Sequence, residues 1–158
     1  MRLSDYTDYT LRVLICCAHQ GEQLLTIAQI AQTLQVSKNH LMKVVNALAR
    51  QGVLETTRGR GGGIRLLKAP SEIGIGDVLR RSETDFRLVE CFDANTDTCT
   101  LTPGCRLRGL LHRALQAYFK ELDAMTLADI ALPVGRPPGA RTPLVPVALP
   151  RSRRRLTT

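Results

Sequence analysis

The chain has 158 residues, of which 44% are hydrophobic, and a formal net charge of +8. A chain of this length can bury a real core, so its fold need not depend on disulfide bonds. Its first apolar run, LRVLICCA, is too short for a signal peptide or a membrane span. We therefore expect a soluble cytoplasmic protein with no membrane partner, in which the five cysteines indicate metal binding, redox chemistry or packing.

The positive charge is unevenly distributed along the chain. Residues 132–158 carry six arginines and no acidic residue, so this arm supplies six of the eight net charges. Residues 38–68 contain seven basic residues against Glu55 alone, whereas residues 83–97 contain five acidic residues against Arg87. The segment 38–68 is therefore suited to an anionic partner.

Three helices are predicted in the first third of the chain. The first begins at Thr7, as its N-cap, and continues to about His19 with apolar residues at helical spacing. Thr26 is expected to cap a short helix over 27–34, and Ser37 the longer helix that follows. Two short helices joined by a tight turn, the second polar and basic on its outer face, are typical of a helix-turn-helix.

A β-hairpin is predicted directly after these helices. Strands over 53–57 and 64–68 flank the turn RGRGGG, whose glycines permit positive φ angles. A hairpin in this position makes the helix-turn-helix a winged helix. One further short helix is expected within 72–83.

A long helix over 106–125 has an apolar stripe that the remaining chain cannot cover. A second copy would cover it, so we expect a two-fold homodimer built on this helix. The residues expected at the dimer contact are Leu107, Leu111, Ala114, Tyr118 and Leu122.

The predicted fold is therefore mainly α with a small β-hairpin. It consists of a winged helix-turn-helix DNA-binding domain over 1–81, followed by a cysteine-rich loop and dimerisation helix over 82–131. Residues 132–158 hold six of the eight prolines and are expected to form a disordered tail.

The basic helix and the hairpin tip together predict DNA binding. A polar helix face alone could be a solvated surface, but Arg58 and Arg60 stand where a wing meets the minor groove. In the major groove, bases would be contacted by Asn39, His40 and Lys43. Phosphate contacts are expected from Ser37, Lys38 and Arg50. A two-fold dimer implies a palindromic operator in double-stranded DNA.

Cys91, Cys99 and Cys105 stand within one polar, acidic loop. Thiolates placed together there would repel one another unless a cation neutralised them. The two-residue gaps of common zinc modules are absent, and the wide spacing favours an iron–sulfur cluster over zinc. Cys16 and Cys17, in contrast, lie in the apolar part of the first helix and are expected to pack in the core.

No group of residues in the sequence indicates an enzyme. There is no Ser/His/Asp set and no paired-carboxylate site, and GRGGGI lies in the predicted hairpin, so it does not open a helix as a nucleotide-binding motif would. We therefore predict a protein that is not an enzyme.

The assembled motifs resemble a known family over residues 1–131. The motifs are MRLSDYTDYTLRVL, VSKNHLMKVVNALARQGVL, RGRGGGIRL, IGDVLR, LTPGCRLRG and MTLADI. They are similar to those of the iron–sulfur winged-helix transcriptional regulators, and above all to the nitric-oxide-sensing repressors among them. The resemblance implies a homodimeric repressor that holds a cluster, [4Fe–4S] in preference to [2Fe–2S], with Cys91, Cys99 and Cys105, and that releases its operator when nitric oxide attacks the cluster.

The resemblance also bears on the fourth ligand. In the cluster-biogenesis branch of the family a histidine three residues after the third cysteine is a ligand, but here that position is Arg108. In the nitric-oxide branch an aspartate is donated by the other subunit, and YTDYTLR places Asp8 there. A competing role for Asp8 is that of a first-turn acid favoured by the helix dipole. The alternatives to nitric-oxide sensing are a regulator of cluster status or redox and a zinc-holding winged-helix repressor.

Overall fold

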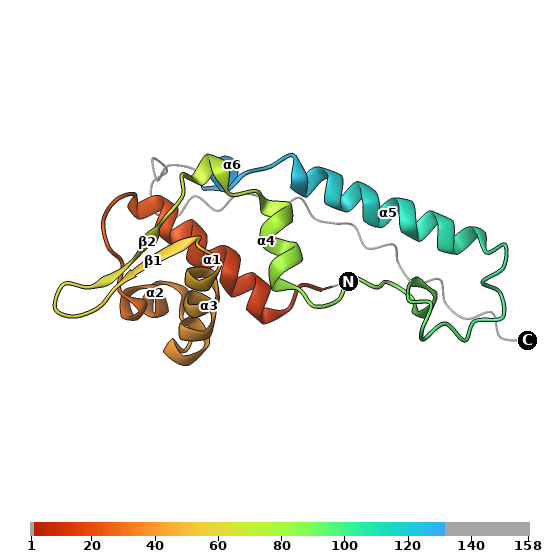
Figure 1. Ribbon diagram of the computed structural model, residues 1–158, viewed down its shortest axis with the longest axis horizontal. Coiled ribbons are helices and arrows are strands. Elements are labelled where there is room, and N and C mark those ends of the chain that lie inside the picture. The colour runs from red at the N-terminus through yellow and green to blue at the C-terminus, as the bar shows by residue number, and fades with distance from the viewer. Residues whose placement is uncertain (1, 132–158) are drawn as a thin grey trace, which may run out of the picture.

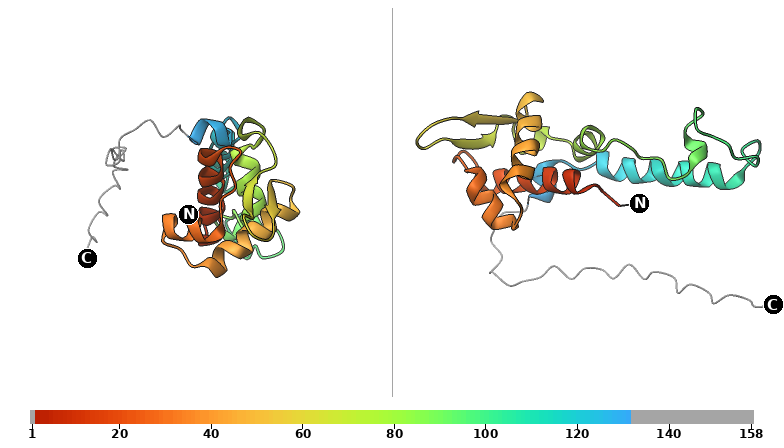
Figure 2. Two further views of the ribbon diagram at one scale, coloured as in Figure 1. Left: turned by 90° about the vertical axis from the view of Figure 1, so that its left-hand side faces the viewer. Right: turned by 90° about the horizontal axis from the view of Figure 1, so that it is seen from below.

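The computed structural model describes residues 2–131 (Figure 1). The chain is mainly helical with one two-stranded antiparallel hairpin, which confirms the predicted fold class. A body of short helices and the hairpin lies at one end, and a long helix extends from it as an arm (Figures 1 and 2). The elements are α1 (Asp5–Gln20), α2 (Ile27–Leu34), α3 (Lys38–Arg50), β1 (Leu54–Thr57), β2 (Gly63–Leu66), the 3-10 turn η1 (Pro70–Glu72), α4 (Ile75–Ser82), the 3-10 turn η2 (Glu90–Phe92), α5 (Arg106–Asp123) and α6 (Leu127–Ile130).

Helix α1 begins earlier than the sequence pattern predicted. Its N-cap is Ser4 and not Thr7, because the Ser4 Oγ accepts a hydrogen bond from the Thr7 N–H at 3.2 Å. That spacing of three residues is the usual one for an N-cap. Thr7 is fully buried inside the first turn. The prediction of Thr7 as the cap is therefore wrong, and the helix gains a turn that includes Asp5.

The helix-turn-helix has the predicted caps. Thr26 caps α2 and forms a capping box with Gln29, and Ser37 caps α3 by accepting a hydrogen bond from the His40 N–H at 3.3 Å. Between the helices Gln35 adopts the left-handed conformation with φ 55°, which turns the chain within three residues.

One continuous core joins α1, α3, α4 and α6. Cys17 belongs to it, as expected, and its burial, with a smaller effect of Cys16, raises the pKa of its thiol to about 12. The thiol therefore stays neutral and packs as a small apolar side chain. The most deeply buried core side chains are Val13, Leu14, Cys17, Ile30, Leu41, Val44, Leu79 and Leu127.

The hairpin is attached to the helices along one edge. β1 and β2 pair with Leu54 opposite Leu66 and Thr57 opposite Gly63. On the other side of β2, Leu25 and Ile64 exchange two backbone hydrogen bonds of 3.0 and 2.8 Å. The hairpin is thus fixed relative to the turn before α2, and only its tip projects from the body.

Helix α4 connects the body to the arm. Arg80 makes two hydrogen bonds to Asp123 of α5, at 2.5 and 2.7 Å, and its guanidinium lies 4.4 Å from the centre of the Phe119 ring. The paired guanidinium lowers the pKa of Asp123. Gly76 leaves the space in which the Asp123 carboxylate lies. These contacts hold the C-terminal end of α5 against the body.

Two features of the C-terminal part were not predicted as such. α5 ends at Asp123, and a further short helix, α6, follows it. α6 is held by long-range backbone bonds, since the Leu127 N–H donates to the Ile73 carbonyl at 2.8 Å.

The predicted tail, 132–158, lies outside the described residues. Within residues 2–131 no helix has the length and apolar character that crossing a membrane requires.

We expect Gly76→Ala to weaken the junction between α4 and α5. The added Cβ would collide with the Asp123 carboxylate and displace it from Arg80. The free energy of unfolding should fall by about 1 kcal/mol, the lower end of overpacking costs, because a helical alanine returns part of the loss. Urea denaturation measures this change. Gly109→Ala is the matched control, since it also lies inside a helix and its Cβ would meet only an ordinary contact, and an equal loss in both variants would contradict the explanation.

Candidate DNA interface and cysteine loop

Helix α3 presents one polar face to solvent. Leu41, Val44, Val45 and Leu48 are buried, and the opposite face exposes the residues predicted to contact DNA. These exposed residues are Ser37, Lys38, Asn39, His40, Lys43 and Arg50. The geometry suits a recognition helix, because the core holds one side of α3 and leaves the other free for the major groove.

His40 lies at one edge of this face, against α1. Its ring stacks on Tyr9 with 6.1 Å between ring centres and 20° between ring planes. A shallow depression between α1 and α3 is lined by both rings together with Asp5, Tyr6 and Lys43. His40 is thus positioned by α1, a contact that the sequence pattern did not predict.

The hairpin tip carries Arg58 and Arg60, both exposed. Each is followed by a glycine with positive φ, 97° at Gly59 and 76° at Gly61, so the tip requires glycine at both places. Within residues 2–131 neither arginine takes part in an ion pair. The same is true of Lys38, Lys43 and Arg50 on α3, so the charges on both elements are free to meet phosphates.

The three loop cysteines lie in different environments. Cys91 is buried within η2, whereas Cys99 and Cys105 are half-buried, and all three are free thiols. Cys105 is the N-cap of α5, and its Sγ accepts a hydrogen bond from the Arg108 N–H at 3.4 Å. Within the described residues, no three Cys, His, Asp or Glu side chains are grouped so that they could hold a metal ion.

The acidic residues of the loop are engaged in its turns. Asp97 accepts hydrogen bonds from the Cys99 N–H and the Thr102 hydroxyl, both at 3.0 Å. Asp93 pairs with Arg87 at 2.7 Å. Hydrogen bonds from the side chain and backbone of Arg87 lower the pKa of Asp85. Asp93 and Asp97 therefore shape the turns of the loop, and Arg87 partly neutralises Asp85 and Asp93.

The loop follows α5 outward from the body. Phe86 packs edge-on against Phe119 with ring centres 4.8 Å apart, and Phe92 against His112 at 6.0 Å. Residues 91–105 accordingly lie along the outer half of α5 and beyond it, far from the hairpin (Figures 1 and 2). The donor types of this loop fit an iron–sulfur cluster, because they are three thiols and one of them, Cys105, already accepts a backbone hydrogen bond at its sulfur. The single chain does not gather the three sulfurs.

Asp8 lies on the surface of α1. Its carboxylate is 42% exposed and makes a two-bond ion pair with Arg12, at 3.0 and 2.9 Å. It belongs to the body, whereas the cysteines belong to the arm, so one chain does not bring Asp8 to them (Figure 1).

The residues predicted for the dimer contact fall into two groups. Tyr118 and Leu122 pack in part against the chain's own core. Leu107 is 58% exposed, Ala114 is exposed and Leu111 is half-buried. No residue of α5 is fully buried. The outer half of α5 is therefore the part that lacks cover from its own chain.

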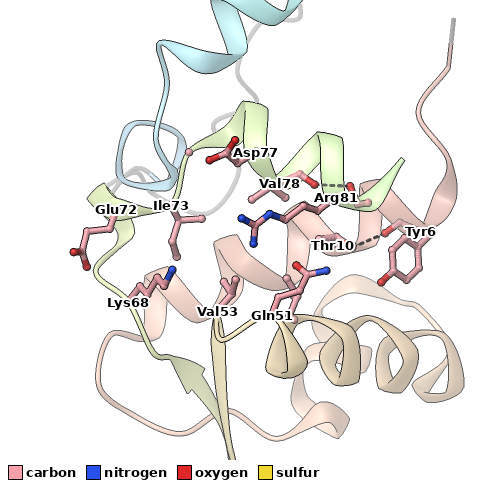
Figure 3. Close-up of a pocket in the computed structure, with 13 residues that line it drawn as sticks. Tyr6, Thr10, Gln51, Val53, Lys68, Glu72, Ile73, Asp77, Val78 and Arg81 are labelled. Carbon is pink, nitrogen blue, oxygen red and sulfur yellow. Dashed lines mark hydrogen bonds between the residues drawn. The ribbon is translucent and has the colours of Figure 1, made fainter. Parts of the chain in front are cut away.

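A small pocket lies where α1, α3 and α4 meet (Figure 3). Arg81 and Gln51 point toward it, with Lys68 across from them and Thr10 behind. Its volume of about 60 Å³ is far below the ~300 Å³ at which ligand sites begin. The pocket is large enough for a few water molecules and is smaller than usual ligand sites.

The sequence of this winged-helix chain matches a known protein family. The family model Rrf2, described as "Iron-dependent Transcriptional regulator", matches residues 3–132. The chain belongs to the Rrf2 family. This confirms the predicted membership of a family of winged-helix regulators.

Two curated relatives of this Rrf2 protein carry the same name. The HTH-type transcriptional regulator NsrR of Bacillus subtilis (strain 168) is 53% identical over 131 residues, which cover 82% of this chain and 90% of the relative. NsrR of Bacillus licheniformis is 51% identical over 133 residues, covering 84% and 93%. The Rrf2 protein is therefore a DNA-binding transcriptional regulator and not an enzyme, as predicted.

Solved structures of the family share the fold. CymR (YrzC), the global cysteine regulator of B. subtilis, superimposes with a TM-score of 0.67 at 28% identity, covering 83% of this chain and 96% of that one. IscR of T. potens superimposes with a TM-score of 0.64 over 82% and 85%. At 23% identity the likeness to IscR concerns the fold alone.

We expect Arg58→Ala and Arg60→Ala each to weaken DNA binding by this Rrf2 protein. Each variant removes one cation from the hairpin tip, so the slope of log affinity against log salt should fall by about one. Fluorescence anisotropy with a labelled operator duplex at several salt concentrations measures the slope. Lys120→Ala, which removes an exposed cation from α5, should leave the slope unchanged. An unchanged slope in the tip variants would remove the wing from the interface.

Proposed function

We propose that this Rrf2 regulator is a nitric-oxide-sensing repressor that holds an iron–sulfur cluster with Cys91, Cys99 and Cys105. The observation that carries the proposal is the set of three free thiols on one short loop, in a chain about half identical to regulators named NsrR. The sequence resemblance to nitric-oxide-sensing repressors supports [4Fe–4S] in preference to [2Fe–2S]. When bound, such a cluster supplies iron that reacts with nitric oxide.

The three cysteines would restrict the loop when they bind a common group. Cys91 is anchored on η2 and Cys105 on the first turn of α5, so tying their sulfurs to Cys99 closes residues 91–105 into a constrained loop. If the cysteines lost this common group, residues 91–105 would regain conformational freedom. The loop would therefore be ordered when the group is bound and more flexible when it is lost.

Two contacts link the end of α4, from which the chain leads to this loop, to the recognition helix. The Ser4 N–H donates to the Glu83 carboxylate at 2.6 Å, which joins the start of α1 to the residue after α4. Further along α1, Tyr9 stacks on His40 of α3. A rearrangement that moves Glu83 would thus act on α1 and through it on α3, which supports release of DNA when the loop relaxes.

A homodimer is part of the proposal. The outer half of α5 exposes Leu107 and Leu110, at 58% and 54%, beside the half-buried Leu111. An apolar stripe of this kind is suited to a second copy of the same helix related by a two-fold axis. Two α3 helices in such a dimer would bind a palindromic operator.

Asp8 of the second copy is proposed as the fourth ligand. Its carboxylate is accessible on α1, but it would have to leave Arg12 in order to bind iron. A ligand that can return to a nearby cation is more easily displaced than a fourth thiolate. Return of the Asp8 carboxylate to Arg12 would therefore make the proposed site accessible to nitric oxide.

We expect the full chain, purified without oxygen, to be coloured and to contain iron and acid-labile sulfide. Nitric oxide should bleach the visible absorption and lower operator affinity at least tenfold, which corresponds to ~1.4 kcal/mol. Cys99→Ser should lose most of the iron because it removes one of three thiolates. Visible spectroscopy, iron and sulfide assays and gel-shift titration measure these effects.

Cys16→Ser is the matched control for this loss, because Cys16 is a half-buried thiol of α1 outside the loop. The Cys16→Ser protein should contain as much iron as the unaltered protein. Colourless protein with stoichiometric zinc would favour the zinc-holding repressor. The protein could also be coloured and bind DNA equally well with and without nitric oxide. If its DNA affinity then changed with loss of the cluster or oxidation of the thiols, the result would favour a sensor of cluster status or redox.

A mixed dimer tests both Asp8 and the partner. A chain with Asp8→Ala keeps its cysteines, and a chain with Cys99→Ser keeps its Asp8. If Asp8 acts across the dimer, mixing the two should restore one complete site per dimer, with a cluster as resistant to chelators as the unaltered one. Each variant alone should have a fragile cluster or none. No gain on mixing would contradict ligation by the second copy.

A further inference from the structure

Met42 is exposed on the recognition helix. Its neighbour Leu41 is completely buried, but Met42 is 43% exposed and is not among the side chains that pack against the core. A single exposed apolar residue is ordinary on a protein surface. Met42 differs because it lies on α3, the element whose outer face a winged helix inserts into the major groove.

Two amide side chains stand beside Met42 on the same exposed face. Asn39 lies three residues before it and Asn46 four residues after it, which places them one helical turn away on either side. Within residues 2–131 neither amide makes a hydrogen bond to protein, and both residues are exposed. The helix thus presents an apolar group between two uncommitted amides.

This set of groups matches the major-groove edge of A·T pairs. Adenine offers an acceptor and a donor that an Asn amide can bind together, and thymine offers a C5-methyl group for apolar contact. His40 lies at the opposite edge of the face, where Tyr9 holds it, and Lys38 and Arg50 are suited to phosphates. G·C pairs, by comparison, are bound through their acceptors by Arg or Lys, a role that the exposed Lys43 would fill at another pair of the site.

We propose that Met42 contacts a thymine methyl group in each operator half-site, with Asn39 and Asn46 bound to adenines beside it. Met42 and the two amides are then specificity-determining residues of α3, and the base pairs that these three side chains contact are A·T pairs. The inference rests on the DNA-binding function and is independent of the metal and of nitric oxide.

The test replaces single thymines by deoxyuridine, which removes only the methyl group. Operator duplexes are first selected from random DNA by the full chain purified without oxygen. Each thymine is then replaced in turn, and affinity is measured by fluorescence anisotropy. At one position in each half-site the affinity should fall about fourfold, the effect of one buried methyl group.

Met42→Ala should bind thymine and deoxyuridine equally at that position, while Met42→Leu keeps most of the preference. Met125→Ala is the matched control, because Met125 is 40% exposed but follows α5, outside the recognition helix. Asn46→Ala should lose its preference for adenine at a neighbouring position. Circular dichroism confirms that each variant is folded.

The outcomes separate this inference from the regulatory function. Sequence-specific binding with no sensitive thymine, or with equal sensitivity in Met42→Ala, would overturn the assignment of Met42 and leave the regulator intact. Binding without any sequence preference would overturn both. Insensitivity to nitric oxide would contradict the sensing proposal and leave the thymine result unaffected.

Discussion

The position of the arm relative to the body depends on the contact between α4 and α5. Arg80 bonds to Asp123 and lies over Phe119, and Gly76 leaves room for the carboxylate. α4 also packs on α1, so the same short helix touches the core and the arm. Because no residue of α5 is fully buried, the direction of the arm is fixed at its inner end, together with the few aromatic contacts along it.

This construction separates two chemistries along one chain. The basic helix and hairpin tip lie on the body, and the thiols lie along the outer half of a helix about 27 Å long. Between them, Ser4 contacts Glu83, at the start of the segment that leads to the thiols, and Tyr9 contacts His40. If the loop senses a signal as proposed, it would act on the DNA-binding elements by moving them, since direct electrostatic effects over that distance are screened by salt.

Most local features, such as helix caps and turn glycines, were predicted correctly because they depend on neighbouring residues. Thr26 and Ser37 were identified as caps, and glycines at the hairpin tip have the positive φ angles expected. Thr7 was mistaken for a cap because both Ser4 and Thr7 carry a suitable hydroxyl. α6 was missed because it depends on a bond from Leu127 to Ile73, far away in the sequence.

The candidate site was predictable only as a list of donor groups. Spacing identifies Cys91, Cys99 and Cys105 as a set, but the described residues of one chain do not bring them together, and local pattern does not describe the bound group and second chain that we propose would do so. Likewise, Met42 falls next to the apolar stripe of α3 in the sequence, and only packing distinguishes its exposure from the burial of Leu41.

The lack of buried residues on α5 has a consequence for protein abundance. In the homodimer proposed above, this helix would gain stability from association, so its apparent stability would rise with protomer concentration. At low copy number the arm would open often and expose its backbone to proteases. Synthesis rate and turnover would then set how much complete regulator is present, in addition to any signal that the loop receives.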